Sequence, residues 1–267
     1  MDFELFANKK VRFMPKSKPF ICDKKNMHEF ERILTGSVKN SIKDCGNKPI
    51  RLHFSGGCDS VALFFCLLNI TKKFTCHTYV FKKNDDFKSS VQICGLYGIE
   101  LVCHTITESD IVENLKYLKL KYGFSGKVNL QCMVGYLAIA KEVKDSLFLN
   151  GAYADALFGS FKSLVFCGAK TDKRIFDKKR NESLNKPNNA ASDYLEKIMD
   201  KESGSIIAYP FYDKSVVDYF MGFDFKSLGG VQKKIFYSAF GDRLPKKHKV
   251  RRRSQQIDSG VRDLGLY

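Results

Sequence analysis

Apolar residues recur in alternating patterns along the first 150 residues or so of the chain. Between residues 27 and 44 they fall at helical spacing, at Phe30, Leu34 and Val38 among others. Pro49 then introduces the β-rich run IRLHF, and a Ser-Gly-Gly turn separates this run from VALFFCLLNI, which predicts a buried helix. The alternation predicts strands at 50–54, 74–81, 99–106 and 145–151, and helices at 27–44, 59–70, 85–98, 108–123 and 129–144. Strands alternating with helices predict an α/β fold, with helices on both faces of a parallel sheet.

The second half of the chain shows a weaker pattern. Residues 169–205 are polar and charged except around Tyr194–Met199, so we expect a mobile insertion there or a plain exposed linker. From residue 206 onward the pattern is helical, in DKSVVDYFMGF and GGVQKKIFYSAFG, and the chain ends in a basic tail. These shifts divide the chain into an N-terminal extension (1–26), an α/β core (27–168), the polar segment (169–205) and a helical C-terminal part (206–267).

Composition narrows the class of protein. The 267 residues are 44% hydrophobic and include 23 Phe, which indicates a folded globular chain. No apolar run is long enough to cross a membrane, and the start MDFELFANKK does not resemble a secretory signal, so we expect a soluble, cytoplasmic protein without a membrane partner. The nine Cys form no CxxC pair, which argues for reduced cysteines rather than a zinc cluster or a disulfide framework.

The formal charge of +16 favours an anionic partner, whether a nucleotide, a nucleic acid or an acidic substrate. Lys-rich solvated surfaces explain most of such an excess equally well. Charge alone therefore does not identify the partner.

The turn SGGCDS, residues 55–60, carries the most informative chemistry. Its two glycines let the backbone approach an anion closely, and the N–H groups at the start of the following helix supply positive potential for phosphate. A carboxylate at Asp59 fits a Mg²⁺ ion that bridges it to phosphate oxygens. The turn lacks the Walker and dinucleotide-binding glycine patterns. Its alternative interpretation is a tight strand-to-helix turn capped by Asp and Ser.

A second unusual turn spans residues 150–160 and also follows a predicted strand. In open parallel sheets, ligands bind outside the carboxyl ends of the strands. We therefore expect the two turns to build one site.

Ser-Gly-Gly-x-Asp-Ser resembles the pyrophosphate loop of the N-type ATP pyrophosphatases, a group that includes asparagine, β-lactam, GMP and NAD synthetases and tRNA-modifying enzymes. Three further stretches resemble asparagine synthetases and occur in that family's order: LFLNGAYADALFGSF, YPFYDKSVVDYF and KKIFYSAFGDRLPKKHKVRRRSQQIDSGV. The resemblance covers most of the chain and implies a Rossmann-like, adenine nucleotide alpha hydrolase-like fold. It also implies cleavage of ATP between its α- and β-phosphates, which leaves an adenylated substrate and magnesium pyrophosphate.

Carried over by position, the resemblance implies roles for particular residues. Asp59 and Asp155 would hold Mg²⁺, and Lys233 would neutralise phosphate charge. The family's second lysine aligns with Arg253 or, by another alignment, with Ser254. Arg253 keeps the positive charge and is preferred. The alternative interpretation of Arg253 is that it belongs to a surface basic cluster without a catalytic role. The expected catalytic residues are then Lys233, Arg253 and Asp155. The other nucleotide-binding residues lie in the two turns and at the strand ends that would read adenine through their backbone: Phe54, Ser55, Gly56, Gly57, Ser60, Phe81 and Gly151.

Two departures from the family bear on the reaction. Ala152 and Ala156 stand where the family has glutamate, and the first of these glutamates handles the substrate amine, which argues against ordinary aspartate amidation. Tyr153 offers a phenol beside Ala152, although packing is the simpler interpretation. No glutaminase domain precedes the first helix, so we expect the protein to use free ammonia, or ammonia or an amine from a partner.

Three functions stay open. The first, favoured by the intact loop and the carboxylate pair, is an asparagine synthetase-like ligase that adenylates a carboxylate or amide carbonyl of an unidentified acceptor and transfers ammonia or an amine to it, using ATP and Mg²⁺. The second is ATP-dependent modification of a tRNA or DNA base, with the positive charge holding the nucleic acid. The third is an inactive module that binds nucleotide or nucleic acid.

Overall fold

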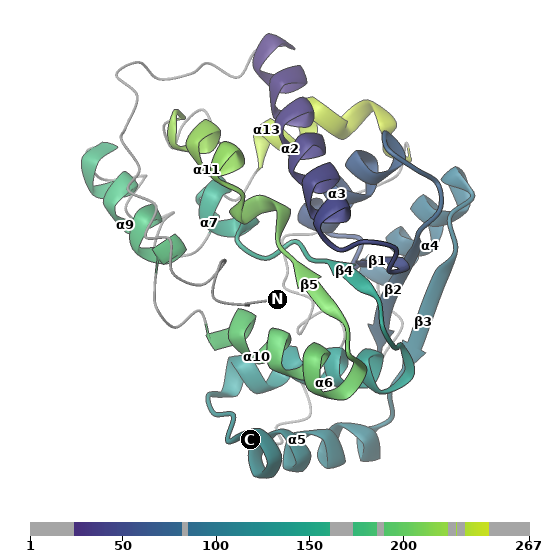
Figure 1. Cartoon of the computed structure of the whole chain (residues 1–267). Coiled ribbons are helices and arrows are strands. Elements are labelled where there is room, and N and C mark those ends of the chain that lie inside the picture. The colour runs from purple at the N-terminus through teal and green to yellow at the C-terminus, as the bar shows by residue number, and fades with distance from the viewer. Residues whose placement is uncertain are drawn as a thin grey trace.

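The computed structural model describes residues 24–81, 85–160, 173–185, 190–223, 228 and 233–245. Within these residues, a five-stranded sheet of order β3-β2-β1-β4-β5 lies at the centre (Figure 1). Its strands are β1 (Ile50–His53), β2 (Thr75–Val80), β3 (Leu101–Thr105), β4 (Leu147–Leu149) and β5 (Ile206–Ala208). Every neighbouring pair is parallel, so the predicted α/β fold with a parallel sheet is confirmed.

β1 and β4 lie side by side at the point where the strand order reverses. From β1 the chain adds β2 and β3 on one side, and it then returns to add β4 and β5 on the other. Leu52 of β1 is opposite both Cys76 of β2 and Leu149 of β4. The loops after β1 and β4 therefore leave the carboxyl edge of the sheet next to each other, where ligands bind in open parallel sheets.

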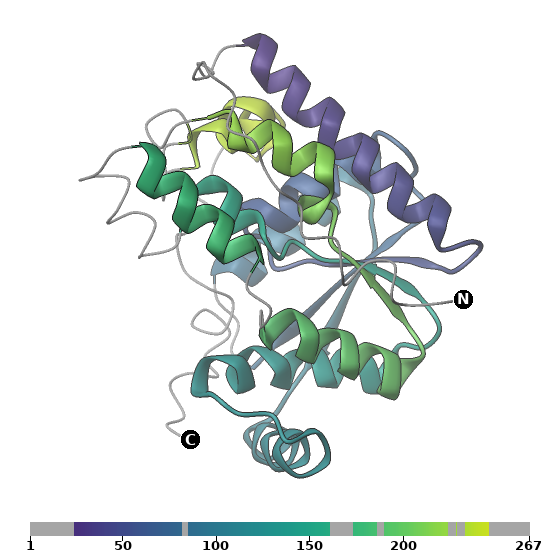
Figure 2. The same cartoon turned by 60° about the vertical axis from the view of Figure 1, so that its left-hand side comes forward.

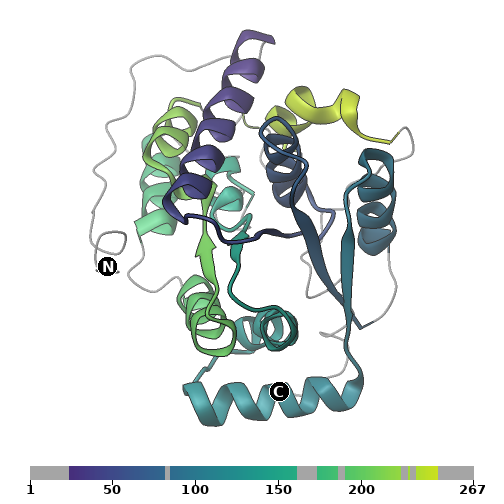
Figure 3. The same ribbon diagram turned by 45° about the vertical axis from the view of Figure 1, so that its right-hand side comes forward.

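Helices cover both faces of the sheet (Figures 2 and 3). One layer, with α2, α3, α4, α11 and α13, packs with Leu52 and Leu147 in one apolar core, and the other, with α5, α6 and α10, packs with Tyr79 and Phe148. The helices are α2 (Lys24–Asp44), α3 (Cys58–Leu68), α4 (Asp85–Tyr97), α5 (Glu108–Tyr122), α6 (Lys127–Glu142), α7 (Ala154–Phe158), α9 (Lys173–Asn185), α10 (Ala190–Ile198), η1 (Met199–Ser203), η2 (Pro210–Tyr212), α11 (Lys214–Met221), α13 (Lys234–Phe240) and η4 (Gly241–Arg243). In the described part of the chain, no helix combines the length and apolarity that a membrane span requires.

Aromatic rings join the helices of the first layer. Phe30 of α2 contacts Phe158 of α7, Phe220 of α11 and Phe240 of α13, with ring centroids 6.2, 5.2 and 5.6 Å apart. Edge-to-face pairs of this kind add about 0.5–1.5 kcal/mol each beyond the area that they bury. They hold the C-terminal helices onto the α/β core.

The prediction of a loop or linker at 169–205 is wrong for the residues that the structure describes there. Residues 173–185 form α9, and residues 190–203 form α10 and η1. In α9, Phe176, Arg180 and Leu184 recur at every fourth position and are buried. Because the rest of α9 is polar apart from the exposed Ile175, the composition of the segment hides this narrow buried stripe.

The C-terminal part begins with a strand, although the sequence pattern predicts helix from residue 206. β5 pairs with β4 through Ile206 opposite Leu147 and Ala208 opposite Leu149. Three residues are too few to show the two-residue period of a strand. The helices predicted after it are confirmed as α11 and α13. Residues 1–23 and 246–267 lie outside the described residues, so the N-terminal extension, the basic tail and the domain boundaries stay predictions.

Candidate active site

The SGGCDS turn joins β1 to α3 at the carboxyl edge of the sheet. The N–H of Phe54 donates to the carbonyl of His77 (2.8 Å), which extends the strand pairing by one residue. Gly56 has a left-handed backbone conformation (φ 76°), which is unfavourable for residues with a Cβ. Gly57, which has no side chain to cap a helix, is the N-cap of α3. The first N–H groups of α3 therefore need an acceptor from elsewhere, and an anion would supply one.

Hydrogen bonds inside the turn set the positions of its two hydroxyls. Ser55 Oγ accepts from the N–H of Gly57 (3.3 Å) and lies 3.3 Å from Ser60 Oγ. Ser60 Oγ also lies within hydrogen-bond distance of the Gly57 carbonyl, to which it donates (3.1 Å). Both serines are thus held beside the start of α3.

The turn after β4 lies directly against the first turn. A Cβ on Gly151 would stand 3.0 Å from Asp59 Cβ and 3.3 Å from the main-chain carbonyl carbon of Asp59, so glycine permits this close approach. Asn150 Nδ2 donates to His53 Nδ1 (3.0 Å), and Asn150 Oδ1 accepts from the N–H of Ala152 (2.8 Å). The structure thus brings the two turns together, as the sequence predicts.

Three charged side chains converge where the turns meet. Lys233 Nζ lies 2.6 Å from Asp59 Oδ1 and 2.8 Å from Asp155 Oδ1. Asp59 is in the first turn of α3, Asp155 is in the first turn of α7, and Lys233 directly precedes α13. The Lys233 side chain is only 14% exposed, so its ammonium is largely withdrawn from solvent. Lys233 and Asp59 are 174 positions apart in the chain, yet their side chains are in direct contact.

The two carboxylates differ in their affinity for protons. Burial raises the pKa of Asp59 to about 6, against the opposing effect of Lys233. Burial also acts to raise the pKa of Asp155, but the charge of Lys233 and hydrogen bonds from Lys233 and Ser160 outweigh it, so this pKa lies below its ordinary value. Burial acts to lower the pKa of Lys233, but the two carboxylates outweigh it and raise that pKa. Lys233 is therefore charged at physiological pH.

The donor set suits a hard divalent cation. The two carboxylates face one point, where the Lys233 ammonium lies, and Mg²⁺ prefers carboxylate and phosphate oxygens as ligands. Two carboxylates and one ammonium sum to a net negative charge, which would repel a polyphosphate without a further cation. Among the described residues, no three His, Cys, Asp or Glu side chains are arranged as a metal site. Asp59 and Asp155 would accordingly share such an ion with phosphate oxygens and water.

The other predicted residues lie less directly at this point. Phe54 is buried and its ring stacks on Phe64 of α3, so a contact with adenine would involve its backbone. Phe81 follows β2 and packs, half-buried, against the second layer of helices. Arg253 lies outside the described residues, and its role stays a prediction. Burial raises the pKa of the Cys58 thiol to about 12, so this residue of the turn is a neutral thiol.

An aromatic cluster at the ends of β4 and β5 does not follow from the sequence. Tyr153 stacks on Tyr212 with ring centroids 4.5 Å apart and meets Tyr209 edge-on at 5.4 Å. The Tyr209 hydroxyl donates to the carbonyl of Ser192 in α10 (3.3 Å). Tyr209 directly follows β5, so its place at the sheet edge depends on a strand that the sequence pattern does not show. These contacts agree with the packing interpretation of Tyr153.

Comparison with known proteins gives a structural likeness without a match in sequence. No protein-family model matches the chain, and no curated protein matches it. Among solved structures, the chain is similar to an NH3-dependent NAD synthetase from Campylobacter jejuni in complex with the nitrate ion. The two are 14% identical with a TM-score of 0.35, and the match covers 67% of this chain and 93% of that one. Similarity at this level does not identify a reaction; the chemistry has to follow from the residues of this chain.

Proposed function

We propose that the protein is an ATP-dependent ligase similar to asparagine synthetases. It adenylates a carboxylate or an amide carbonyl of an acceptor, and it then transfers ammonia or an amine to the activated carbon. ATP is converted to AMP and pyrophosphate. The observation that carries the proposal is the position of Lys233 Nζ, 2.6 and 2.8 Å from Asp59 and Asp155, beside a glycine turn that opens a helix.

The nucleotide would bind at the switch point between β1 and β4. The N–H groups at the start of α3, with the hydroxyls of Ser55 and Ser60, would donate to phosphate oxygens. Asp59 and Asp155 would hold Mg²⁺, which offsets the negative charge of the departing pyrophosphate. Gly151 lets the second turn reach this place without a side chain in between.

The first step forms a bond from an acceptor oxygen to the α-phosphorus of ATP. The bond from that phosphorus to the oxygen bridging to the β-phosphate breaks, and pyrophosphate leaves with the electron pair. Lys233, which contacts both carboxylates, would donate to the phosphate oxygens as their negative charge grows. Arg253 would be the second cation. In the second step the nitrogen nucleophile attacks the activated carbon, AMP leaves, and the nucleophile loses a proton.

Residues 152 and 156 favour an acceptor other than free aspartate. Ala152 and Ala156 stand where asparagine synthetases carry glutamate. Ala156 is 1% exposed within the first apolar core, so a carboxylate at this position would be strongly desolvated. Ala152 lies half-buried in the turn itself. The turn therefore offers no carboxylate of its own at these two positions to hold the ammonium group of an amino acid.

The products formed from ATP test the proposal. We expect the purified protein with Mg²⁺, ATP and ammonium to release AMP and pyrophosphate with at least one carboxylate or carboxamide of a panel that also contains tRNA and duplex DNA. Asp59→Asn should abolish this release, because the metal loses a ligand. Asp200→Asn removes an exposed carboxylate of η1, paired with Lys201, and serves as the matched control that keeps the activity.

Formation of ADP and phosphate would contradict the proposal, as would turnover that Asp59→Asn leaves unchanged. Release with tRNA or DNA as the acceptor would select the nucleic-acid-modifying alternative. A protein that binds ATP but releases no pyrophosphate with any member of the panel would instead favour the inactive module.

A further inference from the structure

Arg180 is completely buried at the junction of three helices. It lies in α9 and is 0% exposed. Its guanidinium donates to three main-chain carbonyls: Nη2 to those of Leu157 (2.9 Å) and Phe220 (2.8 Å), and Nη1 to that of Phe223 (3.3 Å). Through these bonds α9 is attached to both α7 and α11, which lie beside it (Figure 1).

The three carbonyls belong to the C-terminal ends of helices. Leu157 is in the last turn of α7, Phe220 is in the last turn of α11, and Phe223 lies just beyond α11. The last carbonyls of a helix have no partner inside it, and the helix dipole favours a cation there. One guanidinium thus satisfies the ends of two helices, in a fork geometry that a lysine ammonium does not reproduce.

Burial of this charge is energetically unfavourable. Burial lowers the pKa of Arg180 to about 10, although Asp177, whose Oδ1 lies 3.5 Å from Nη1, opposes the shift. The Phe176 ring lies 5.1 Å from the guanidinium carbon. An apolar side chain of similar volume often avoids the desolvation cost of a buried ion. The arginine at this position therefore points to a requirement for geometry rather than for stability alone.

α7 is the helix that carries Asp155. With five residues it is too short to be stable by itself, so its neighbours decide where its side chains lie. Near its N-terminal end Asp155 contacts Lys233, and near its C-terminal end the carbonyl of Leu157 contacts Arg180. Because these two contacts are only two residues apart, a displacement of the Leu157 carbonyl would displace the Asp155 carboxylate.

We propose that Arg180 is a positioning residue for Asp155: by holding the end of α7 against α11, it keeps the Asp155 carboxylate close enough to Asp59 for both to ligate one Mg²⁺. The inference rests on the proposed function, since it takes Asp155 to be a metal ligand.

Binding of magnesium pyrophosphate, measured by titration calorimetry, tests the inference without an acceptor. Arg180→Met removes the three hydrogen bonds at similar volume, and Arg180→Lys keeps the charge but not the fork. We expect the affinity to fall about 10- to 100-fold in Arg180→Met, the range typical of residues that orient metal ligands, and by less in Arg180→Lys. Binding of pyrophosphate without Mg²⁺ should change little in either variant.

A double-mutant cycle separates positioning from general destabilisation. If Arg180 acts through Asp155, Arg180→Met should add almost nothing to the effect of Asp155→Asn on affinity. Leu118→Ala, in the apolar core of the other helix layer, is the control for stability. It should lower Tm without changing the affinity for magnesium pyrophosphate.

The possible failures are distinguishable. If the unmodified protein does not bind magnesium pyrophosphate, the proposed function is wrong. Two results for a protein that does bind would show that Arg180 does not position Asp155. In the first, both Arg180 variants bind magnesium pyrophosphate as tightly as the unmodified protein. In the second, the losses of binding free energy in Arg180→Met and Asp155→Asn add in the double variant. If Arg180→Met does not fold, the same cycle with Arg180→Lys gives the decision.

Discussion

Asp59 and Asp155 share one ammonium but differ in exposure. The Asp59 side chain is 23% exposed, whereas that of Asp155 is 45% exposed. Burial raises the pKa of Asp59 to about 6, whereas at Asp155 the charge of Lys233 and hydrogen bonds from Lys233 and Ser160 outweigh burial and lower the pKa. Asp59 is therefore the residue that limits metal binding in acid.

We expect the Asp59 carboxyl to be half protonated near pH 6 in the protein without ligand. Its ordinary pKa is 3.8, so the folded state binds this proton more tightly than the unfolded state, and ionisation of Asp59 costs stability as the pH rises through 6. Magnesium pyrophosphate requires the ionised form, and its binding should weaken as the pH falls through 6. Carboxyl ¹³C NMR would follow the titration, with Asp59→Asn assigning the signal.

Lys233→Met provides the comparison for this titration. Lys233 lowers the pKa of both carboxyls, so its removal should raise both midpoints. An Asp59 midpoint at or below the ordinary aspartate value in the unmodified protein would contradict the effect of burial.

Gly151→Ala is expected to damage the site more than the fold. The added methyl would stand 3.0 Å from Asp59 Cβ and 3.4 Å from the main-chain nitrogen of Ser60, so one of the two turns has to shift. We expect pyrophosphate release from ATP to fall by about tenfold or more, and the free energy of unfolding to fall by about 1–3 kcal/mol.

Gly95→Ala in α4 is the control for Gly151→Ala. Its added methyl meets nothing within 4 Å. It should raise the free energy of unfolding by about 0.5–1 kcal/mol, because alanine is the better helix former, and leave activity unchanged. Full activity of Gly151→Ala would show that the two turns do not need this close contact.

The residues of the site are easier to predict than their contacts. Two glycines, two serines and an aspartate between a strand and a helix suit phosphate binding, so the SGGCDS turn can be proposed as a site from the sequence alone. Lys233 follows only from the family resemblance, because no local pattern shows that it meets Asp59 from 174 positions away. The different pKa values of Asp59 and Asp155 depend on burial, which the sequence does not show.

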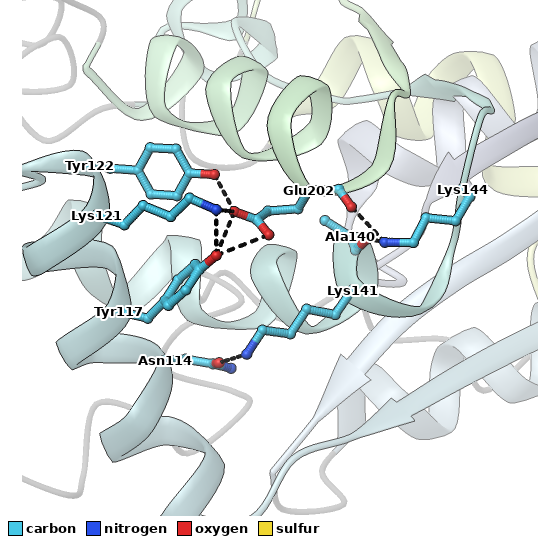
Figure 4. A network of polar contacts seen from close by, with 8 residues as sticks. All are labelled: Asn114, Tyr117, Lys121, Tyr122, Ala140, Lys141, Lys144 and Glu202. Carbon is cyan, nitrogen blue, oxygen red and sulfur yellow. Dashed lines mark hydrogen bonds and ion pairs between the residues drawn. The ribbon is translucent and has the colours of Figure 1, made fainter.

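Among the elements, η1 is attached to α5 by a polar network (Figure 4). Glu202 of η1 accepts hydrogen bonds from Tyr117 (3.0 Å), Lys121 (2.8 Å) and Tyr122. Burial acts to raise the pKa of Glu202, but hydrogen bonds from these three residues outweigh it, and the pKa is lowered. Because β5 follows shortly after η1, this network helps to place the last strand of the sheet.

Glu202→Gln is expected to lower the free energy of unfolding by about 1–3 kcal/mol at neutral pH, because an amide cannot accept from three donors as a carboxylate does. The lowered pKa means that the contribution of Glu202 is present above its ordinary value of 4.5 and is lost as the pH falls through the folded-state value. The difference between the two proteins in urea unfolding should therefore shrink in acid.

Glu113→Gln changes an exposed glutamate of α5 and is the control for Glu202→Gln. It should alter the free energy of unfolding by less than about 0.5 kcal/mol. If Glu202→Gln is as stable as the unmodified protein at neutral pH, the network does not hold η1.

Elements with a strong local pattern can be predicted, and elements that depend on distant partners cannot. α3 is an apolar run that begins after a glycine turn, and β2 is a short run rich in β-branched and aromatic residues; both follow from the sequence. α9 depends on Arg180, whose hydrogen-bond partners lie in and beyond α7 and α11. β5 depends on its pairing with β4, and its three residues have no pattern of their own.

For the molecule as a whole, the site joins segments that are far apart in the chain. Asp59 follows β1, Asp155 follows β4, and Lys233 precedes α13, the last α-helix described. Both turns rest on the sheet that separates the two helix layers. A ligand bound at this point should stabilise the folded state as a unit, because its contacts are lost when either the sheet or the C-terminal helices unfold.

We therefore expect ATP with Mg²⁺ to raise Tm. A ligand that binds only the folded state adds about 2.7 kcal/mol to the free energy of unfolding at 100 times its Kd, which corresponds to roughly 5–10 °C for a chain of this size. Scanning calorimetry suits the measurement, since the chain has no Trp.

ATP with a chelator in place of Mg²⁺ should give a clearly smaller shift in Tm, because Asp59 and Asp155 then repel the phosphates across a short distance. In Asp59→Asn the dependence on Mg²⁺ should largely disappear, while the glycine turn keeps some affinity for ATP. Equal shifts with and without Mg²⁺ in the unmodified protein would show that the carboxylates hold no metal. The shift in Tm reflects affinity for the folded state alone, so the measurement needs no acceptor. Comparing the shifts with and without Mg²⁺ separates the contribution of the metal to ATP binding from that of the glycine turn.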